Sequence, residues 1–308
     1  PAAACCAAGE SAAKSAEVAG RTSASEASMA SRLEKLRAEL EALPGMSRAR
    51  VGIALLVDGR DELLVGDGPD YPLLSVVKLP LAMAVLDRLE REGRSLDEQV
   101  VFTKGDLDPE TWSPMRDAYP EGSSSLTLRD LLLYALQQSD NNATDLLFDR
   151  LVSPRGVMSY LQGLGLTEQV IAHTEREMGE DPRRCLVNSM SPRCAVRLLE
   201  RVMNGSVLGA SSRAFLLEAL EGCQTGQNRI AAGLKGVPGE GMGHKTGTGP
   251  LLPGRGLVGH NDVAFVRLSN AHYYVLAVFV TDSQMSPTET EALIASISAC
   301  VARSLSEL

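Results

Sequence analysis

A serine and a lysine at helical spacing form the first candidate for chemistry in this chain. Ser75 and Lys78 stand three residues apart at the start of a predicted helix, so their side chains share one face of it. The lysine can then take the serine proton, and the positive end of the helix dipole favours the resulting alkoxide. The pattern is weak alone, because a capping serine followed by a surface lysine is common.

Two further motifs follow. Ser139-Asp140-Asn141 lies between two predicted helices, and Lys245-Thr246-Gly247 lies on a predicted strand, where Gly247 leaves room for a ligand to approach the backbone. Capping residues and an ordinary strand bend explain each motif separately. The combination of all three, in this order and on these elements, is much more specific than any one of them.

Hydrophobic periodicity predicts the helices and strands that position these motifs. The chain begins with an amphipathic helix from about residue 29 to 43, and Asp58-Gly59 then predicts a hairpin between two short strands. Residues 75–204 are predicted helical nearly throughout. The predicted elements that follow are strands at 244–248, 257–268 and 273–281 and a last helix at 287–305.

This order predicts an α/β domain plus an all-α domain. An antiparallel sheet flanked by helices is built from both chain ends (29–66 and 222–308), and a helical domain (67–221) is inserted between them. We expect a cleft where the two meet. Residues 1–28 are small or polar and predict a flexible leader. In it, Cys5 is a candidate lipid-anchor site, with a plain processed tail as the alternative.

Composition excludes several functions. The 308 residues include 39 acidic and 30 basic ones, and the net charge of -9 disfavours nucleic acid. The six cysteines and four histidines lack the spacing of metal ligands, so we expect no metal and no cofactor. Whether Cys185 and Cys194 form a bridge stays open. His244 directly before Lys245 breaks the phosphate-loop pattern, and no Gly-x-Ser-x-Gly elbow is present.

Taken together, the three motifs resemble those of class A serine β-lactamases and penicillin-binding proteins. Their separations, 139 - 75 = 64 and 245 - 139 = 106 residues, suit class A, and the segments 112–117 and 139–145 resemble its Bacteroidetes-type, extended-spectrum branch. The resemblance implies hydrolysis of penicillins and cephalosporins through a serine acyl-enzyme, by a monomer exported to the bacterial periplasm. Its partner would be the small-molecule β-lactam substrate.

The resemblance also implies site roles. Ser75 would be the nucleophile, Lys78 a proton acceptor or a tuner of its neighbours, and Ser139 a proton relay to the departing ring nitrogen. The implied substrate contacts are the side chain of Asn141 to the amide side chain, the strand Lys245-Thr246-Gly247 with its lysine on the carboxylate, and backbone N–H groups of Ser75 and Thr248 as the oxyanion hole. Trp112 is a candidate wall of the cleft, with a buried aromatic as the alternative.

Arg255 is a further candidate for the substrate carboxylate. It is expected to point from a strand toward Lys245 and to make a forked contact, with a solvated loop arginine as the alternative.

Glu175 separates a hydrolase from its relatives. Class A enzymes carry a glutamate that activates the deacylating water, and Glu175 fits better than Glu177 two residues on. His173 and Asn188 stand where most members have an arginine and aspartate pair, and Gly179 replaces an asparagine at the water site. A D-alanyl-D-alanine carboxypeptidase and a β-lactam sensor that stays acylated are the alternatives, and Glu175 argues against the first.

Overall fold

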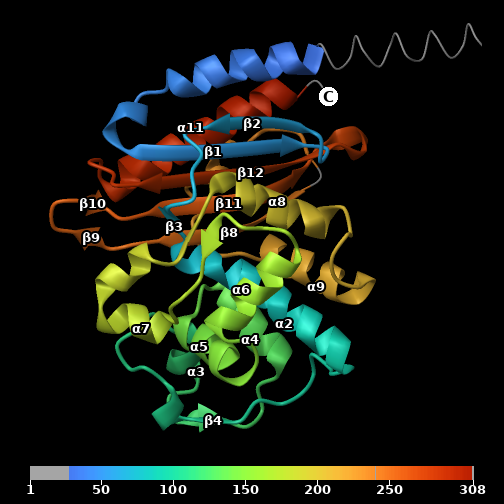
Figure 1. The fold of residues 1–308 in the computed structure, drawn as a ribbon, viewed down its shortest axis with the longest axis vertical. Helices are drawn as coiled ribbons and strands as arrows, with labels where there is room; N and C mark the ends of the chain where they lie inside the picture. The colour runs from blue at the N-terminus through green and yellow to red at the C-terminus, as the bar shows by residue number, and fades with distance from the viewer. Residues whose placement is uncertain (1–27, 240, 307–308) are drawn as a thin grey trace, which may run out of the picture.

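The centre of the molecule is a five-stranded antiparallel sheet in the order β2-β1-β12-β11-β8. The computed structural model describes residues 28–239 and 241–306. The strands of the sheet are β1 (Arg50–Val57), β2 (Asp61–Val65), β8 (Gly241–Thr248), β11 (His260–Arg267) and β12 (Tyr273–Thr281). Strand β1 pairs with β12 from Arg50↔Thr281 to Val57↔Tyr274, so the two ends of the chain are joined in the middle of the sheet (Figure 1).

Local sequence explains the first hairpin. Asp58 and Gly59 link β1 to β2 with φ of 48° and 69°, the left-handed values that a tight hairpin turn requires and that Asp-Gly tolerates. The predicted hairpin is therefore confirmed. Strand β8 lies at the edge of the sheet and pairs only with β11 among the described strands. That edge carries the third motif.

Helices cover both faces of the sheet. Alternate strand residues, such as Ile53 and Leu55, pack against the helix over residues 28–41 and against α11 (Pro287–Leu305) on one face. The residues between them, such as Ala54 and Leu56, face α8 (Pro192–Met203) and the helical layer. This period-two alternation is what a sheet buried on both faces requires.

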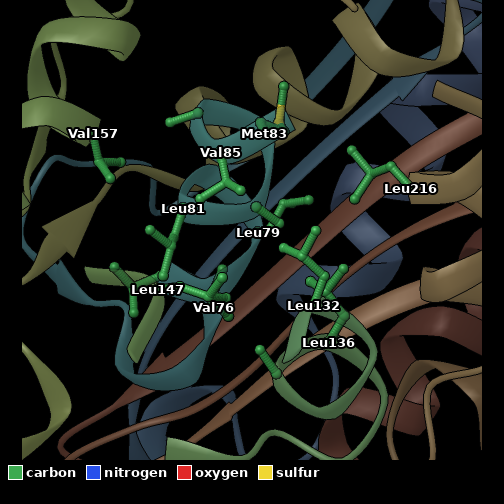
Figure 2. Packing of buried hydrophobic residues seen from close by; sticks show 14 of the residues in the cluster. Val76, Leu79, Leu81, Met83, Val85, Leu132, Leu136, Leu147, Val157 and Leu216 are labelled. Atoms are coloured by element: carbon green, nitrogen blue, oxygen red, sulfur yellow. The ribbon is translucent and has the colours of Figure 1, made fainter. Parts of the chain in front are cut away.

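The helical layer is built around α2 (Lys78–Glu92), which is buried along most of its length. Figure 2 shows its leucine and valine side chains among those of neighbouring helices. These neighbours are α4 (Leu128–Gln137), α5 (Asn141–Arg150), α6 (Pro154–Gly163) and α9 (Ala210–Glu221). Caps fix their starts: Thr127 and Asp130 form a capping box on α4, and Asp140 caps α5. The second motif is thus the turn between α4 and α5.

Short elements connect these layers. The remaining helices are η1 (Met46–Arg48), η2 (Leu74–Val77), η3 (Lys104–Asp106), α3 (Pro114–Ala118), α7 (Glu175–Glu180), η4 (Pro182–Leu186), α10 (Ile230–Gly233) and η5 (Ser269–Ala271). Two-residue strands are β3 (Tyr71–Pro72), β4 (Phe102–Thr103), β5 (Gly122–Ser123), β6 (Gln169–Val170), β7 (Ser189–Met190), β9 (Leu251–Leu252) and β10 (Gly256–Leu257). Four of these, β4 to β7, interrupt the segment predicted as almost wholly helical, because two residues are too few to show a period.

The predicted fold class is confirmed, an antiparallel sheet from both chain ends with helices around it. The division at residues 67 and 221 stays a prediction, and α8 within that segment packs on β1 and β12. Cys5 and all but the last residue of the predicted leader lie outside the described residues. The cysteines at 185, 194, 223 and 300 are free thiols. Within residues 28–239 and 241–306, no helix combines the length and apolarity needed to cross a membrane.

Candidate active site

Ser75 is held by a strained turn. It lies in η2, one turn ahead of α2, and the preceding Leu74 has a φ of 50°. A left-handed leucine costs about 1–3 kcal/mol and persists only where packing enforces it. The Leu74 side chain does pack tightly, because it fills the space beside Gly249 and Gly259 and joins a small apolar cluster with Val258. The strain is therefore fixed next to the candidate nucleophile.

Gly247 has a different function from the predicted one. A Cβ atom on this residue would lie 2.5 Å from the carbonyl oxygen of Leu73 and 3.2 Å from Leu74 Cβ. The space is occupied by the protein's own turn and is not open to a ligand, so that expectation is wrong. The glycine instead lets β8 approach η2, which brings Ser75 and the strand motif to the same place.

Lys78 joins the first motif to the second. Its side chain is fully buried, and its ammonium group lies 3.1 Å from Ser75 Oγ. It also donates to the Ser139 carbonyl oxygen at 2.7 Å and to Asn141 Oδ1 at 2.5 Å, and lies 3.2 Å from Glu175 Oε1. A buried charge needs such partners. The contact predicted between Ser75 and Lys78 is present.

Ser139 lies between two lysines. Its Oγ atom accepts from Lys78 Nζ at 3.3 Å and from Lys245 Nζ at 3.0 Å, and its backbone has a left-handed φ of 57°. When both lysines are charged, the hydroxyl proton of Ser139 points away from them, because an ammonium group cannot accept it. A hydroxyl so constrained is well placed to pass a proton to a group in the cleft.

Lys245 reaches the site from β8. Its side chain is fully buried, and Nζ also donates to the Thr246 carbonyl oxygen at 2.9 Å. Burial lowers the pKa of Lys245 to about 7, and nearby Lys78 acts in the same direction, against the anions Glu175 and Asp262 and the Cys223 thiol. An anionic ligand group would stabilise the charged form of Lys245.

Glu175 begins α7 and turns toward Lys78. Thr174 caps this helix, and Asp145 Oδ1 and Oδ2 accept from the N–H groups of Glu175 and Arg176 at 2.9 and 2.8 Å. Only 9% of the Glu175 side chain is exposed. Glu177 points elsewhere: its Oε2 accepts from Thr174 N–H at 2.9 Å, and 45% of its side chain is exposed. Of the two candidates, Glu175 alone contacts the lysine of the first motif.

Asn188 braces the loop that leads into Glu175. Its Oδ1 accepts from the N–H groups of Ala172 and His173 at 2.8 and 3.0 Å, and its Nδ2 donates to the His173 carbonyl oxygen at 2.8 Å. Asn188 is fully buried. Three hydrogen bonds between this one amide and the backbone thus hold the loop, at the position where the resemblance has one partner of an arginine and aspartate pair.

Two cavities meet at Ser75. One, of about 330 Å³, is lined by Ser75, Trp112, Ser139, Asn141, Thr225, Thr246 and Thr248. The other, of about 260 Å³, adjoins Ser75 on the side of Glu175 and Gly179. Trp112 is 63% exposed and donates through Nε1 to the Gln138 carbonyl oxygen at 2.9 Å. It forms a wall of the first cavity and is not a buried aromatic.

The backbone N–H of Thr248 faces the cleft. Gly249 N–H donates to the Gly259 carbonyl oxygen at 2.8 Å, so in the alternating antiparallel ladder the next pair, Thr248↔His260, is not hydrogen-bonded. The Thr248 N–H therefore points away from β11, off the sheet edge. Ser75 N–H belongs to the first turn of η2, where N–H groups have no partner within the helix. These two groups can bind a developing oxyanion.

Arg255 lies away from this site. It occupies the turn between β9 and β10, and its guanidinium contacts both oxygens of Asp282 at 2.7 and 3.0 Å. The predicted orientation toward Lys245 is wrong, because the turn places the side chain on the surface, 43% exposed. Its alternative, a solvated loop arginine, describes the structure better.

Arg229 is the arginine that the sequence reasoning missed. It is 3% exposed and donates to Thr248 Oγ1 at 2.7 Å and to the Gly247 carbonyl oxygen at 2.9 Å. Its position in a loop before α10 follows no motif or period, so no sequence signal identified it. Thr111 was missed as well, and its Oγ1 accepts from Asn141 Nδ2 at 2.8 Å.

Comparisons with known proteins agree with this arrangement. A model of the β-lactamase enzyme family matches residues 34–305. A β-lactamase of Phocaeicola vulgatus is 38% identical over 85% of this chain and 81% of its own, and the extended-spectrum β-lactamase PER-1 of Pseudomonas aeruginosa is 31% identical over 85% and 84%. A class A β-lactamase structure from Bacteroides cellulosilyticus, 29% identical, superposes with a TM-score of 0.83 over 90% of this chain and 99% of that one.

Proposed function

The chain belongs to the β-lactamase enzyme family, as a class A member related to enzymes of Bacteroides and to extended-spectrum ones, and we propose that it hydrolyses penicillins and cephalosporins through an ester on Ser75. The observation that carries the proposal is the contact of Lys78 with both Ser75 Oγ and Glu175 Oε1. It brings a nucleophile and two proton-transferring groups within one cluster, joined by a hydrogen bond and an ion pair.

In the acylation step, Ser75 Oγ attacks the lactam carbonyl carbon, and the pair of Lys78 and Glu175 takes its proton. The carbonyl oxygen becomes an oxyanion between the N–H groups of Ser75 and Thr248, and each such donor is worth about 3 kcal/mol in the transition state. As the C–N bond breaks, Ser139 gives its hydroxyl proton to the ring nitrogen and regains one from Lys78, 3.3 Å away. The ring is then open and the acyl group is on Ser75.

In the deacylation step, the Glu175 carboxylate takes a proton from water, and the hydroxide attacks the ester carbon. Ser75 leaves with a proton, which restores the free enzyme. The position of Glu175 beside the second cavity at Ser75 supports this role. It also argues against the carboxypeptidase, which shares the serine, lysine and strand motifs but is not expected to carry this glutamate, and against a sensor that stays acylated.

Substrate binding would use the rest of the cleft. We assign the substrate carboxylate to Lys245 and Thr246, with Arg229 adding positive charge behind Thr248. Asn141 is 2.8 Å from Thr111 Oγ1 and would hold the amide side chain, while Trp112 forms the wall. Gly247 contributes by letting β8 reach η2.

For location we propose the bacterial periplasm, since class A β-lactamases are generally exported. A monomeric state and a lipid anchor at Cys5 stay predictions.

The test is covalent labelling. Wild-type protein mixed with benzylpenicillin should pass through an adduct of one penicilloyl group and hydrolyse many equivalents of a chromogenic cephalosporin. Ser75→Ala should form no adduct in intact-protein mass spectra, whereas Ser113→Ala, a serine outside the reacting cluster, should still be acylated. A persisting adduct on Ser75→Ala would remove Ser75 as the nucleophile.

A further inference from the structure

A second cluster of ionisable side chains lies behind the floor of the cleft. Cys223 follows α9, His244 lies on β8 and Asp262 lies on β11, and all three side chains are buried. His244 Nδ1 is 3.0 Å from Asp262 Oδ1. The Gln227 amide nitrogen lies 3.5 Å from His244 Nε2 and donates to the Cys223 carbonyl oxygen at 2.8 Å, which brings Cys223 beside the same imidazole. Hydrolysis of a β-lactam as described above uses none of these groups.

The arrangement favours a positive charge on His244 and a negative charge on the sulfur of Cys223. Asp262 Oδ2 accepts the N–H of Ile230 at 3.1 Å, so both oxygens of this buried carboxylate have a partner. Burial by itself lowers the pKa of His244, but Asp262 and Cys223 outweigh it and raise that pKa to about 10. Burial likewise raises the pKa of the Cys223 thiol, and His244, Lys245 and Thr225 together overcome it and bring the value to about 7. An acid, an imidazole and a thiol in this order are the components of an activated cysteine.

The other described cysteines provide an internal comparison. Burial raises the pKa of Cys185 to about 11 and that of Cys194 to about 12, and it also raises the pKa of Cys300. These three thiols behave as ordinary buried cysteines. Only Cys223, among the residues that the structure describes, has an imidazole that favours its thiolate.

Cys223 also adjoins the substrate cavity. Its Sγ is 3.5 Å from Thr225 Oγ1, and that hydroxyl is 2.6 Å from Thr246 Oγ1. Both threonines line the cavity that holds Ser75. The loop over the sulfur is partly open to solvent, with Gln224, Gln227 and Asn228 exposed. The thiol is therefore separated from the cleft by one small side chain.

We propose that Cys223, charged by His244 and Asp262, is a nucleophilic site for small soft electrophiles, and that its modification disables the adjoining subsite at Lys245 and Thr246. With iodoacetamide, the thiolate sulfur forms a C–S bond while the C–I bond breaks and iodide leaves, and His244 keeps its proton. The product is neutral, so Lys245 loses a nearby anion that favours its charged form. The added carboxamidomethyl group also presses on Thr225. The loss of activity rests on the proposed hydrolysis, whereas the modification does not.

The charged groups that face the thiol come from several elements. They are His244 and Lys245 on β8 and Asp262 on β11, with Lys78 of α2 and Glu175 of α7 acting through Lys245. Of these, His244 lowers the pKa of the Cys223 thiol most. Its replacement by asparagine removes the cation and leaves a side chain of similar polarity.

The experiment measures alkylation of each cysteine in the full chain. The protein is treated with iodoacetamide from pH 5.5 to 9, and labelling rates are read by peptide mass mapping. Cys223 should label with a midpoint near pH 7 and, at pH 7, at least tenfold faster than Cys185, Cys194 or Cys300. In His244→Asn the midpoint should move above pH 8. Labelling of Cys223 no faster than that of the other three would overturn the proposal.

Hydrolysis is followed in parallel. The activity of wild type should fall in step with Cys223 labelling. Cys223→Ser should keep its own starting activity under the same treatment. The matched control Cys194→Ser retains Cys223 and should lose activity as wild type does. Full labelling of Cys223 with no loss of activity would refute its connection to Lys245. If the wild type hydrolyses no β-lactam, that result counts against the proposed function. The test of the thiol still stands, because labelling is measured by mass and not by activity.

Discussion

Replacing Glu175 by glutamine should convert a fast hydrolase into a protein that stays acylated. The variant keeps the size of the side chain but removes the carboxylate that lies beside the second cavity and contacts Lys78 at 3.2 Å. Loss of a positioned general base costs about 10² to 10⁴ in rate, and this corresponds to about 2.7–5.4 kcal/mol in the barrier to deacylation. The assay is intact-protein mass after mixing with benzylpenicillin, with the adduct followed over time.

Acylation should survive in this variant. Lys78 still lies 3.1 Å from Ser75 Oγ and stays in reach of its proton. One penicilloyl group should therefore accumulate on Glu175→Gln, while wild type returns to its unmodified mass once the substrate is consumed. The matched control is Glu177→Gln, which alters the capping box with Thr174 and the contact with His173 and should turn over normally.

Two results would refute the reasoning. If Glu177→Gln accumulates the adduct and Glu175→Gln does not, the base has been assigned to the wrong residue. If wild type itself stays acylated, the chain is a sensor or a slow transpeptidase-like protein despite its relatives.

Two further predictions concern the substrate carboxylate. Arg255→Ala breaks an exposed ion pair with Asp282 and should leave KM within about twofold. Arg229→Ala removes charged hydrogen bonds worth about 1.5–3 kcal/mol and should raise KM about tenfold or more. The reverse result in steady-state kinetics would restore Arg255 to the site. Burial lowers the pKa of Lys245 to about 7, so its charge is present below pH 7 and lost above it. The kcat/KM for a penicillin should then fall by roughly tenfold from pH 7 to 8.5, and a penicillin methyl ester, which lacks the carboxylate, should show no such fall.

The sequence predicted what is local. Ser75 and Lys78 depend on one helical turn, and the contact between them follows from spacing alone. The strands at both chain ends follow from apolar runs, and the Asp58-Gly59 turn follows from its backbone preference. Features of this kind need no knowledge of the partner elements.

The sequence could not predict what depends on long-range packing. Arg229 contacts Thr248 because the loop before α10 folds over β8, and no period in the chain encodes that approach. Arg255 was assigned to a strand, but its segment turns between β9 and β10 and meets Asp282. For Arg255 the residue type suggested a role, but the direction of the side chain could not be predicted because it is set by where the backbone turns.

Gly247 shows how closely fold and site depend on each other. Its missing side chain admits the Leu73 carbonyl oxygen, and a Cβ there would lie only 2.5 Å from that atom. The same close approach sets the strained Leu74 against the end of β8, so that Ser75 and Thr248 line one cavity. An alanine at position 247 would have to move β8 away from η2 by a few tenths of an ångström or more. The N–H groups of Ser75 and Thr248 would then move apart. The oxyanion hole would therefore be weakened by a shift that is too small to unfold the protein.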